Sequence, residues 1–520
     1  MNFDRRELLR AGAGIALVAG FSRSPLFARP LGADPFTLGV ASGDPWPDGF
    51  VIWTRLAPRP LEEHGGMPAA HVPVRWEVAE DQGFKRVVRK GEAVAIPELG
   101  HSVHVEVDGL RPHRHYWYRF VVAGSDVSTA GMARTAPPAG ALLDRLRIGV
   151  GGCQHYEMGY FDAWGHLAKE PDLDLIFHYG DYIYEYGAMP LGPRAGGGTT
   201  VREHVGDEIY SLDDYRRRYA QYKSDPHLRA AHAACAFAPS FDDHEIDNNW
   251  VGDFDQGGTS PEVFALRRMA GLQAWYEHMP VRKAQFPTLG GIRAFRALDF
   301  GRLMRMHVLD TRSYRADQPC DDGKRQPCLG QDLNASTVLG KDQEEWLDRG
   351  LGSGATWNLL AQQIMAMPFD FRGPGATEER RATDIWDAYR PARARLKESI
   401  RQRGLTNVIV ATGDHHKHLV GTVPENDEVP DGKGIAVEFL TGSISSDGNG
   451  KGDEAIRHFR PNNPHVALHT DRRGYQVFDI SPKAWTTEVK VMDQVEKPGG
   501  MIRTLSKFVV TPEAAALHNA

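Results

Sequence analysis

The sequence predicts an α/β protein with a β-rich domain in front of it. Residues 36–134 contain short alternating runs and turns without a helical period, which indicates strands. From Asp144 onward, apolar runs of strand length alternate with stretches of helical spacing, the pattern of an α/β sheet. The length of 520 residues is too great for one ordinary core, so we expect two or more domains.

The first 28 residues have the pattern of an export signal. Arg5 and Arg6 precede a short apolar run, residues 11–21, which is too short to span a bilayer, and small residues follow near Ala28. The paired arginines favour a twin-arginine signal, which the Tat export machinery reads, over a general secretory signal. We therefore predict a periplasmic or secreted protein with no stable membrane span.

Composition and charge exclude several classes of protein. A hydrophobic content of 41% and a charged content of 25% are typical of globular proteins. Residues 1–28 hold four arginines against Asp4 and Glu7, a net charge of +2, so the chain without them carries −9 in place of −7. An acidic chain without a basic patch argues against a nucleic-acid-binding domain. We expect a monomer.

Residues 34–134 are expected to form a small β-sandwich. Residues 72–78 alternate between apolar and polar side chains, as in a half-buried strand. The run 110–112 followed by Tyr116 resembles the tyrosine corner of fibronectin-type sandwiches, in which a tyrosine hydroxyl bonds to the backbone upstream. Residues 135–142, rich in Pro, Ala and Gly, are expected to form the linker to the next domain.

Residues 143–505 are expected to form the α/β domain. Helical spacing predicts helices over 215–234, 261–278, 342–351 and 391–402. Residues 506–520 are expected to form a C-terminal tail, with a short capped helix over 511–519. Cys320 and Cys328 flank a polar loop, and in an exported protein we expect a disulfide between them, whereas Cys235 is expected to be a buried thiol.

Four apolar runs in this domain each end in side chains that can bind metal. In an open α/β sheet the ligand crevice lies at the carboxyl ends of the strands, so groups far apart in the chain can converge there. The four ends are Gly151-Gly152-Cys153, the segment from His178 to Tyr184 with Asp181, the segment Phe241-Asp242-Asp243-His244-Glu245, and Gly413-Asp414-His415-His416.

The second of these ends indicates the kind of metal. A tyrosine such as Tyr184, close to a bridging Asp181, ionises only when a strongly acidic cation lowers its pKa, which favours Fe(III) over Zn(II). The thiolate of Cys153 suits the same ion. The alternative is an ordinary hydrogen bond at the end of the strand.

The third and fourth ends indicate a second metal. Alternate residues that leave a strand end point to the same side, so Asp414 and His416 can each hold a different cation, and Asp243-His244 completes a two-metal spacing. A single histidine among the 22 is more often structural than a ligand. The four ends in this order are the observation that favours a shared metal cluster.

Several motifs together resemble the PhoD-type alkaline phosphatase family of calcineurin-like metallophosphoesterases. They are Gly149 to Gln154, Gly180-Asp181-Tyr182-Ile183-Tyr184-Glu185-Tyr186, Asp242-Asp243-His244-Glu245 with Asn248-Asn249-Trp250, Leu309 to Arg315, Leu339-Gly340 with Gln343 and Trp346, and Thr412-Gly413-Asp414 with His416. The resemblance covers both domains. It implies a four-layer αββα catalytic domain preceded by a small fibronectin-III-like β-sandwich.

The resemblance also implies a cluster of Fe3+ and Ca2+. Carried over by position, the iron ligands would be Cys153, Asp181, Tyr184 and His416. The residues facing calcium would be Asp181, Asp243 and Asp414, with Asn248 or Asn249 as a helper. His415 departs from the family pattern, which has an apolar residue there.

We therefore hypothesise an exported phosphatase that hydrolyses phosphate monoesters, small or polymeric, with phosphodiesterase activity. A metal-activated hydroxide would attack phosphorus, and Asp181 would be essential. Arg312 would stabilise negative charge on the phosphoryl oxygens, and His244 would donate a proton to the leaving group. For Arg312 the alternative is an ion pair with Asp310 or a neighbouring acid.

Two alternatives remain at this point. One is a phosphodiesterase or phospholipase D-like enzyme that acts on phospholipid or teichoic acid. The other is a surface binding protein in which the metal cluster is purely structural.

Overall fold

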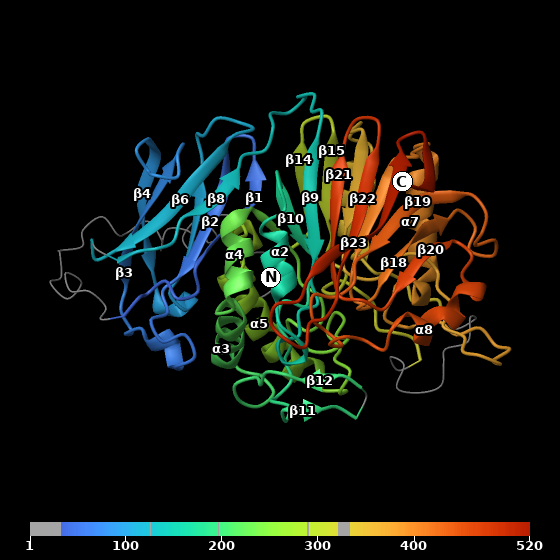
Figure 1. The fold of residues 1–520 in the computed structure, drawn as a ribbon, viewed down its shortest axis with the longest axis horizontal. Coiled ribbons are helices and arrows are strands. Elements are labelled where there is room, and N and C mark those ends of the chain that lie inside the picture. Colours follow the sequence, from blue (N-terminus) through green and yellow to red (C-terminus); the bar gives the residue numbers. More distant parts are fainter. Residues whose placement is uncertain (1–32, 125, 196, 289–290, 321–332) are drawn as a thin grey trace, which may run out of the picture.

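The computed structural model describes residues 33–520, apart from residues 125, 196, 289–290 and 321–332 (Figure 1). The expected export signal, residues 1–28, lies outside the described part. Two large mixed sheets dominate the fold, and a smaller antiparallel sheet lies at the N-terminal end (Figure 1). In spatial order, the ten-stranded sheet contains β24 (Ala514–Asn519), β23 (Ile502–Thr511), β22 (Trp485–Met492), β21 (Gly474–Ile480), β9 (Leu146–Gly151), β10 (Leu175–His178), β13 (Phe237–Pro239), β1 (Val40–Trp46), β2 (Gly49–Arg55) and β5 (Ser102–Val107).

The other sheets are smaller. The seven-stranded sheet contains, in spatial order, β14 (Arg296–Phe300), β15 (Met304–Val308), β16 (Trp357–Ala361), β17 (Val408–Thr412), β19 (Gly434–Leu440), β18 (His418–Pro424) and β20 (Val466–Thr470). The N-terminal sheet contains β4 (Val87–Ala95), β3 (Val72–Ala79), β6 (His115–Val122), β7 (Asp126–Val127) and β8 (Gly131–Arg134), and a hairpin is formed by β11 (Gly192–Pro193) and β12 (Thr199–Thr200).

Helices connect these strands. The α-helices of the described residues are α2 (Asp162–Leu167), α3 (Leu212–Lys223), α4 (Pro226–Ala234), α5 (Pro261–His278), α6 (Gly340–Leu351), α7 (Arg390–Gln402) and α8 (Asp453–Ile456). Short 3-10 turns lie at Glu63–Gly66, Pro97–Leu99, Tyr156–Met158, Lys283–Gln285, Trp386–Ala388 and Arg457–Asn462. In the described part of the chain, no helix is long and apolar enough to cross a membrane.

The two large sheets share one core. Val150 and Phe177 of the ten-stranded sheet lie in the same buried cluster as Met306, Leu359 and Ile409 of the seven-stranded sheet. Because successive side chains of a strand point to opposite faces, the neighbouring residues face outward and pack against helices. A second buried cluster joins β10 and β13 to α2, α3 and α5, and a third joins β16 and β17 to α6 and α7.

The N-terminal strands are continuous with the larger sheet. β1 pairs in parallel with β13, where Gly43 lies opposite Phe237. A side chain at position 43 would approach the Pro280 carbonyl oxygen to 2.2 Å, so this close pairing requires glycine. One sheet therefore crosses the expected boundary at residues 135–142.

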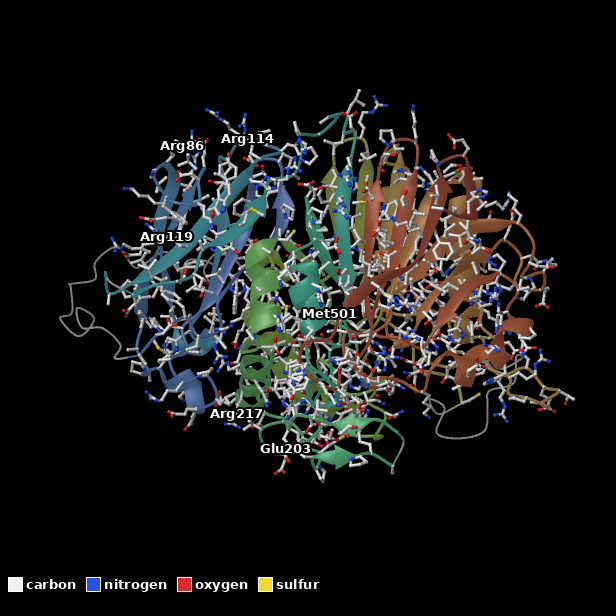
Figure 2. All side chains as sticks on the ribbon, viewed as in Figure 1. Arg86, Arg114, Arg119, Glu203, Arg217 and Met501 are labelled. Carbon is white, nitrogen blue, oxygen red and sulfur yellow. The ribbon has the colours of Figure 1, made fainter. Side chains whose placement is uncertain are left out.

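The expected tyrosine corner has the expected hydrogen bond. The hydroxyl of Tyr116 accepts a hydrogen bond from the backbone N–H of Arg111 at 2.9 Å. Tyr116 and Tyr118 of β6 also pack against Phe50 of β2, so they join the N-terminal sheet to the ten-stranded sheet. Arg86, Arg114 and Arg119 mark this end of the molecule, whereas Glu203 lies beside the β11–β12 hairpin (Figure 2).

The helix predicted over 511–519 is wrong. Residues Ala514–Asn519 form strand β24, which pairs antiparallel with β23 and contacts β19. The alanines favour a helix locally, but pairing with the open edge of β23 outweighs that preference. The hydroxyl of Thr406 donates to the carbonyl oxygen of Pro512 at 2.6 Å, before β17 begins. The tail therefore packs at the opposite end of β17 from Asp414.

The helix predicted over 215–234 is divided in two. α3 ends at Lys223 and α4 begins at Pro226, whose fixed φ suits the first turn of a helix. The side chain of Asp225 caps α4 by accepting hydrogen bonds from the N–H groups of His227 and Leu228. The helix predicted over 261–278 is confirmed as α5.

The cysteines follow the sequence expectation where the structure describes them. Cys320 takes part in a disulfide bond, and its expected partner Cys328 lies outside the described residues. Cys235 is a buried free thiol, as expected.

Candidate metal centre

The predicted residues meet at the carboxyl ends of strands from both large sheets. Cys153 lies two residues beyond β9, and Asp181 lies three residues beyond β10. Asp414 and His416 follow β17 of the seven-stranded sheet. Asp243 follows β13 in the same way. The predicted ligands therefore leave the carboxyl ends of strands in both large sheets, as expected.

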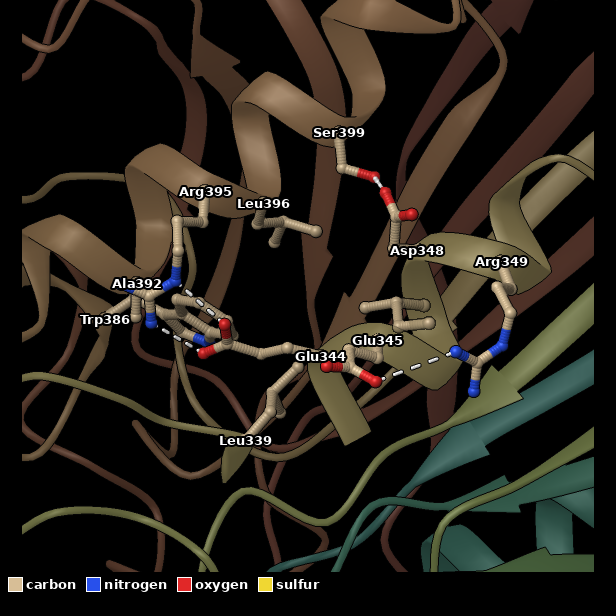
Figure 3. Close-up of a pocket in the computed structure, with 11 residues that line it drawn as sticks. Leu339, Glu344, Glu345, Asp348, Arg349, Trp386, Ala392, Arg395, Leu396 and Ser399 are labelled. Atoms are coloured by element: carbon tan, nitrogen blue, oxygen red, sulfur yellow. Dashed lines mark hydrogen bonds and ion pairs between the residues drawn. The ribbon is translucent and has the colours of Figure 1, made fainter. Parts of the chain in front are cut away.

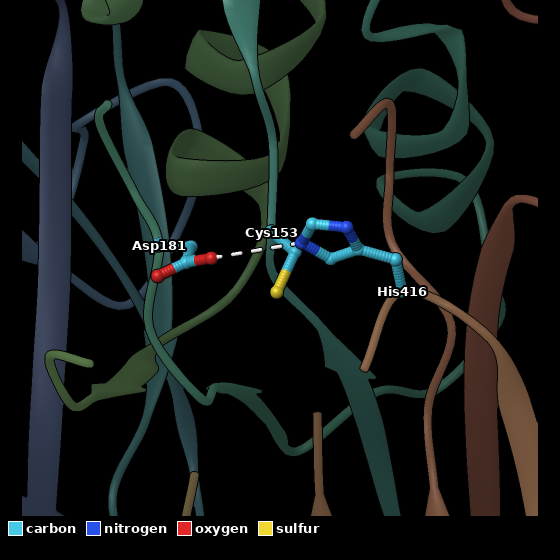
Figure 4. Close-up of side chains that lie close together, drawn as sticks. All are labelled: Cys153, Asp181 and His416. Atoms are coloured by element: carbon cyan, nitrogen blue, oxygen red, sulfur yellow. Dashed lines mark ion pairs between the residues drawn. The ribbon is translucent and has the colours of Figure 1, made fainter. Parts of the chain in front are cut away.

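A first group of potential ligands contains Cys153, Asp181 and His416 (Figure 4). Their ligand atoms all lie within 4.8 Å of one another, and Asp181 Oδ2 is 3.9 Å from His416 Nε2. The hydroxyl of Tyr184 donates to Asp181 Oδ2 at 2.7 Å and lies 3.2 Å from His416 Nε2. All four residues predicted to hold iron are therefore adjacent.

Two further groups adjoin the first. Asp181, Asp243 and His244 form one, and Asp242, Asp243 and Asp414 form the other, each with its ligand atoms within 4.8 Å of one another. Asp181 belongs to both the first and the second group, and Asp243 links the second to the third. The potential ligands thus form a continuous chain of donors, wide enough for more than one cation.

The backbone at these positions is unusual. Cys153, Asp181, Asp414 and His416 have φ values of 49°, 55°, 64° and 60°, in the left-handed region that residues with a Cβ rarely adopt. Such strained residues gather at functional sites, where the surrounding structure holds them in place. At two of them the backbone itself is tied, since the N–H of Cys153 donates to Gly180 O and that of Gln154 donates to Asp181 O.

The donor set fits cations. Asp181 Oδ1, Asp242 Oδ2 and Asp243 Oδ1 are buried and have no hydrogen-bond partner within the described chain. Desolvation, followed by the charges of neighbouring acids, raises the pKa of Cys153 and of Asp414 well above the usual range. Burial and then Asp181 likewise raise the pKa of Tyr184. Without a nearby positive charge, the ionised forms of these ligands are unfavourable. Bound cations would stabilise the ionised forms.

His244 is held in one orientation by a carboxylate. Its Nδ1 lies 2.7 Å from Glu185 Oε2, and its ring lies over that of Tyr184 at a centroid distance of 4.1 Å. Burial opposes a positive charge on this ring, but Glu185, Asp243 and Asp181 outweigh it and hold the pKa of His244 well above its usual value. In the absence of metal, these acids therefore favour the protonated form of His244.

Arg312 is fully buried among acids. Its Nε lies 2.5 Å from Asp242 Oδ1, and its guanidinium lies 2.9 Å from Asp384. This agrees with the ion-pair alternative for a neighbouring acid, whereas Asp310 accepts from the backbone N–H groups of Arg312 and Ser313 and forms no ion pair with the guanidinium among the described contacts. One guanidinium nitrogen has no hydrogen-bond partner in the described part and lies 3.7 Å from Asp243 and 3.9 Å from Asp414. Arg312 thus also faces the potential ligands.

Asn248 makes hydrogen bonds outside the ligand groups through its two nitrogens. Its side-chain nitrogen donates to Gln256 at 2.8 Å, and its backbone N–H donates to Glu185. The neighbouring Asn249 approaches the centre through its backbone, whose N–H donates to Asp243 Oδ2 at 2.8 Å.

Three acids that support the site were not predicted. Glu245 accepts hydrogen bonds from the backbone N–H groups of Asp181, Tyr182 and Asp242, which fixes two strand ends together. Asp447 lies 3.2 Å from His416 Nδ1, and Glu185 orients His244. Glu185 and Glu245 directly follow predicted site residues in the sequence, and this position could have identified them. Nothing in the sequence indicates a role for Asp447.

A separate pocket lies between α6 and α7 (Figure 3). It has a volume of about 290 Å³, and Glu344 and Arg395 form an ion pair of 2.7 Å on its wall. None of the predicted site residues lines it. The chemistry of the chain therefore centres on the strand ends.

Known proteins share this architecture. Two family models match the chain: the PhoD-like phosphatase model over residues 148–489 and the model of its N-terminal domain over residues 22–137. The chain belongs to the PhoD-like phosphatase family. It is 43% identical to alkaline phosphatase D of Bacillus subtilis (strain 168) over 529 aligned positions, covering 99% of this chain and 89% of that protein.

A solved structure agrees with this assignment. The structure described as "Structure of PhoD" superposes with a TM-score of 0.89 and 43% identity, covering 95% of this chain and 93% of that one. This member of the PhoD-like family is therefore a phosphoric ester hydrolase with an α/β fold. The alternative of a non-enzymatic surface binding protein is wrong.

Proposed function

We propose that this phosphoric ester hydrolase is an exported phosphatase that cleaves phosphate monoesters, with additional activity on diesters, at a centre of iron and calcium. The observation that carries the proposal is the position of Asp181, which belongs to the group with Cys153 and His416 and also to the group with Asp243 and His244. A carboxylate with two oxygens can bridge two cations. The layering of helices over two facing sheets is consistent with the αββα metallophosphoesterase arrangement, and the N-terminal sheets with a fibronectin-III-like sandwich.

The proposed ligands divide between the two kinds of ion. Cys153, Asp181, Tyr184 and His416 would hold Fe3+, because thiolate, phenolate and carboxylate suit a strongly acidic cation. Asp181, Asp243 and Asp414 would face Ca2+ together with an oxygen from Asn248, since calcium takes only oxygen ligands among these groups. When bound, these ions would lower the pKa of water and neutralise charge on a phosphoryl group.

The chain's own residues would complete the reaction. The free guanidinium nitrogen of Arg312 is close enough to the acids to bind a phosphoryl oxygen there, and Asp242 and Asp384 hold it in place. His244 carries a proton that it can donate to the leaving oxygen, and Glu185 keeps its ring oriented.

The decisive experiment combines activity and composition. We expect the purified wild-type protein to contain iron and calcium by elemental analysis and to hydrolyse 4-nitrophenyl phosphate faster than bis(4-nitrophenyl) phosphate. Asp181→Asn should lower kcat for both by about 100-fold or more, because it removes the shared charge. Asp253→Asn, at an exposed carboxylate that pairs with Arg268, is the matched control and should leave kcat unchanged.

The same assay tests the second candidate. A phosphodiesterase or phospholipase D-like enzyme would prefer the diester and would release choline or glycerol from phospholipid or teichoic acid. A preference for diesters would replace the monoesterase proposal. Zinc in place of iron, or full activity in Asp181→Asn, would contradict the proposed centre.

A further inference from the structure

A second polar pocket lies directly beside the proposed metal centre. Its volume is about 450 Å³, and the side chains that matter for its chemistry are Arg194, Lys417, Lys451, Asp447, Asp471 and Ile456. Arg194 follows β11, Lys417 precedes β18, and Lys451 precedes α8. Three cations from distant parts of the chain therefore converge on one hollow.

One carboxylate separates this pocket from the metal centre. Asp447 lines the pocket, and its Oδ2 lies 3.2 Å from Nδ1 of His416. Nε2 of the same imidazole faces Asp181. Lys417 is the next residue after His416. The pocket and Asp181 therefore lie on opposite sides of the His416 ring.

Two of the three cations of the pocket have no ion-pair partner among the described residues. No carboxylate of the described residues lies within the 4.0 Å ion-pair distance of Arg194 or Lys451, and Arg194 Nε is buried without a hydrogen-bond partner there. Lys417 Nζ is 4.0 Å from both Asp447 and Asp471, which is the limit of an ion pair.

The acids of the pocket are already occupied. Asp471 accepts from Arg473 at 2.5 Å and from the backbone N–H of Lys451, and Asp447 is engaged by His416. Glu496, close to Arg194, accepts the backbone N–H groups of Thr199 and Asn449. The hollow thus holds three cations and two acids, and the salt bridges of the described residues include none for Arg194 or Lys451.

We propose that this pocket binds a second phosphoryl group of the substrate while the first is hydrolysed. The inference rests on the proposed function, since it assumes that an ester phosphate occupies the neighbouring centre. Arginine and lysine are the residues that bind phosphate groups in proteins, and a concave site with low-dielectric walls strengthens their attraction. The preferred substrates are thus monoesters that carry a second phosphate, such as bisphosphates.

A matched pair of substrates tests this proposal. Butane-1,4-diol monophosphate and butane-1,4-diol bisphosphate differ only in the second phosphate. We expect the metal-loaded wild-type protein to have the lower KM for the bisphosphate. Lys451→Met and Arg194→Met should each raise that KM by about threefold to fivefold, as expected for loss of one partly exposed ion pair, and should leave kcat and the KM of the monophosphate unchanged.

Two controls separate this effect from general loss of positive charge. Lys341→Met removes an equally mobile cation from the surface of α6, where the side chain is 84% exposed, and should change neither KM. Raising the salt concentration should reduce the preference for the bisphosphate in the wild type but not in Lys451→Met, because screening weakens exposed charge pairs.

The outcomes are distinguishable from failure of the proposed function. If the wild type hydrolyses neither substrate, the proposed function fails. If it hydrolyses both with equal KM values, and the two pocket variants behave like the wild type, only the present inference is overturned. If Lys451→Met changes inhibition by inorganic phosphate but not the KM of the bisphosphate, the pocket binds free phosphate and the inference is likewise overturned.

Discussion

Single residues of the centre combine a strained backbone with a charge that destabilises the chain. Asp414 has a φ of 64°, which asparagine also tolerates. Desolvation, followed by Asp242 and Asp243, raises the pKa of Asp414 well above its usual range. A buried acid in this position is therefore unfavourable in the metal-free chain, as we expect of the proposed calcium ligand.

The first prediction concerns Asp414→Asn. Removing the negative charge relieves repulsion among the acids without straining the backbone, so we expect the chelator-treated variant to melt at a higher temperature than chelator-treated wild type. The metal-loaded variant should lose activity by about 100-fold or more, because one oxygen ligand has lost its charge. Calorimetry and kcat on 4-nitrophenyl phosphate measure the two effects. A lower melting temperature together with full activity would show that Asp414 stabilises the chain and binds no metal.

The second prediction concerns Tyr184. Burial and Asp181 favour its neutral phenol in the absence of metal, so only a strongly acidic cation would bind it as phenolate. We expect the wild type to be coloured by a phenolate-to-iron absorption band in the visible range, and Tyr184→Phe to lose that band. Tyr210→Phe is the control, since Tyr210 is 55% exposed and its ring lies against Arg267. A colourless wild-type protein that contains zinc would contradict the assignment of iron.

At the scale of elements, one buried ion pair joins the two large sheets. Both oxygens of Asp44, in β1, accept hydrogen bonds from Arg296, in β14, at 2.7 and 2.8 Å. Asp44 is fully buried, and Arg296 also donates to Pro239 O at the end of β13. The pair therefore holds three strands together close to where β13 leads into Asp243.

The third prediction is that Asp44→Asn destabilises the protein. Removing one partner leaves the charge of Arg296 buried and uncompensated, which costs about 3 to 5 kcal/mol in comparable cases. Asparagine can adopt the φ of 43° at this position, so the loss of stability measures the removal of the negative charge and not backbone strain. Urea unfolding measures it, with Glu77→Gln as the control, since the partly exposed Glu77–Arg119 pair should contribute at most about 1 kcal/mol. Equal urea midpoints for both variants would show that the Asp44–Arg296 pair does not stabilise the contact between the sheets.

Elements with strong local signals were predicted well. Helix α5 has a proline at its first position and a helical run behind it, and its bounds agree with the prediction. The helix prediction for the C-terminal tail was wrong because three consecutive alanines favour a helix locally. The tail instead pairs with the open edge of β23, a long-range contact that local propensity does not include. The continuity of β1 with β13 was missed for the same reason, since Gly43 and Phe237 are far apart in the chain.

At the scale of the whole molecule, the metal centre was largely predictable because strand ends gather at one edge of a sheet. Cys153, Asp181, Asp414 and His416 were found in this way and do lie together. The sequence did not predict Asp447, because this residue lies in an irregular loop and contacts the predicted ligands through His416. Groups that touch a predicted residue from elsewhere in the fold leave no local pattern in the sequence.

The last prediction concerns the stability of the whole molecule as metal and pH change. Asp242, Glu245 and Asp414 have pKa values raised by burial and by neighbouring acids, so without metal the folded chain binds protons that the unfolded chain releases. Stability is then lost as pH rises above the ordinary carboxyl pKa and through the raised values. The raised pKa of His244, where burial is outweighed by Glu185, acts in the same direction, because its proton is lost on unfolding.

We therefore expect chelator-treated protein to melt at progressively lower temperatures between about pH 5 and pH 8. Metal-loaded protein should melt higher at every pH in this range and show a flatter profile, because cations binding only the folded state stabilise it and replace those protons. Calorimetry across this range, with Asp414→Asn as the internal comparison, measures both slopes. The variant should have a smaller slope without metal. Identical profiles with and without chelator would mean that the buried acids hold no cation, and that the convergence of strands from both sheets serves packing alone.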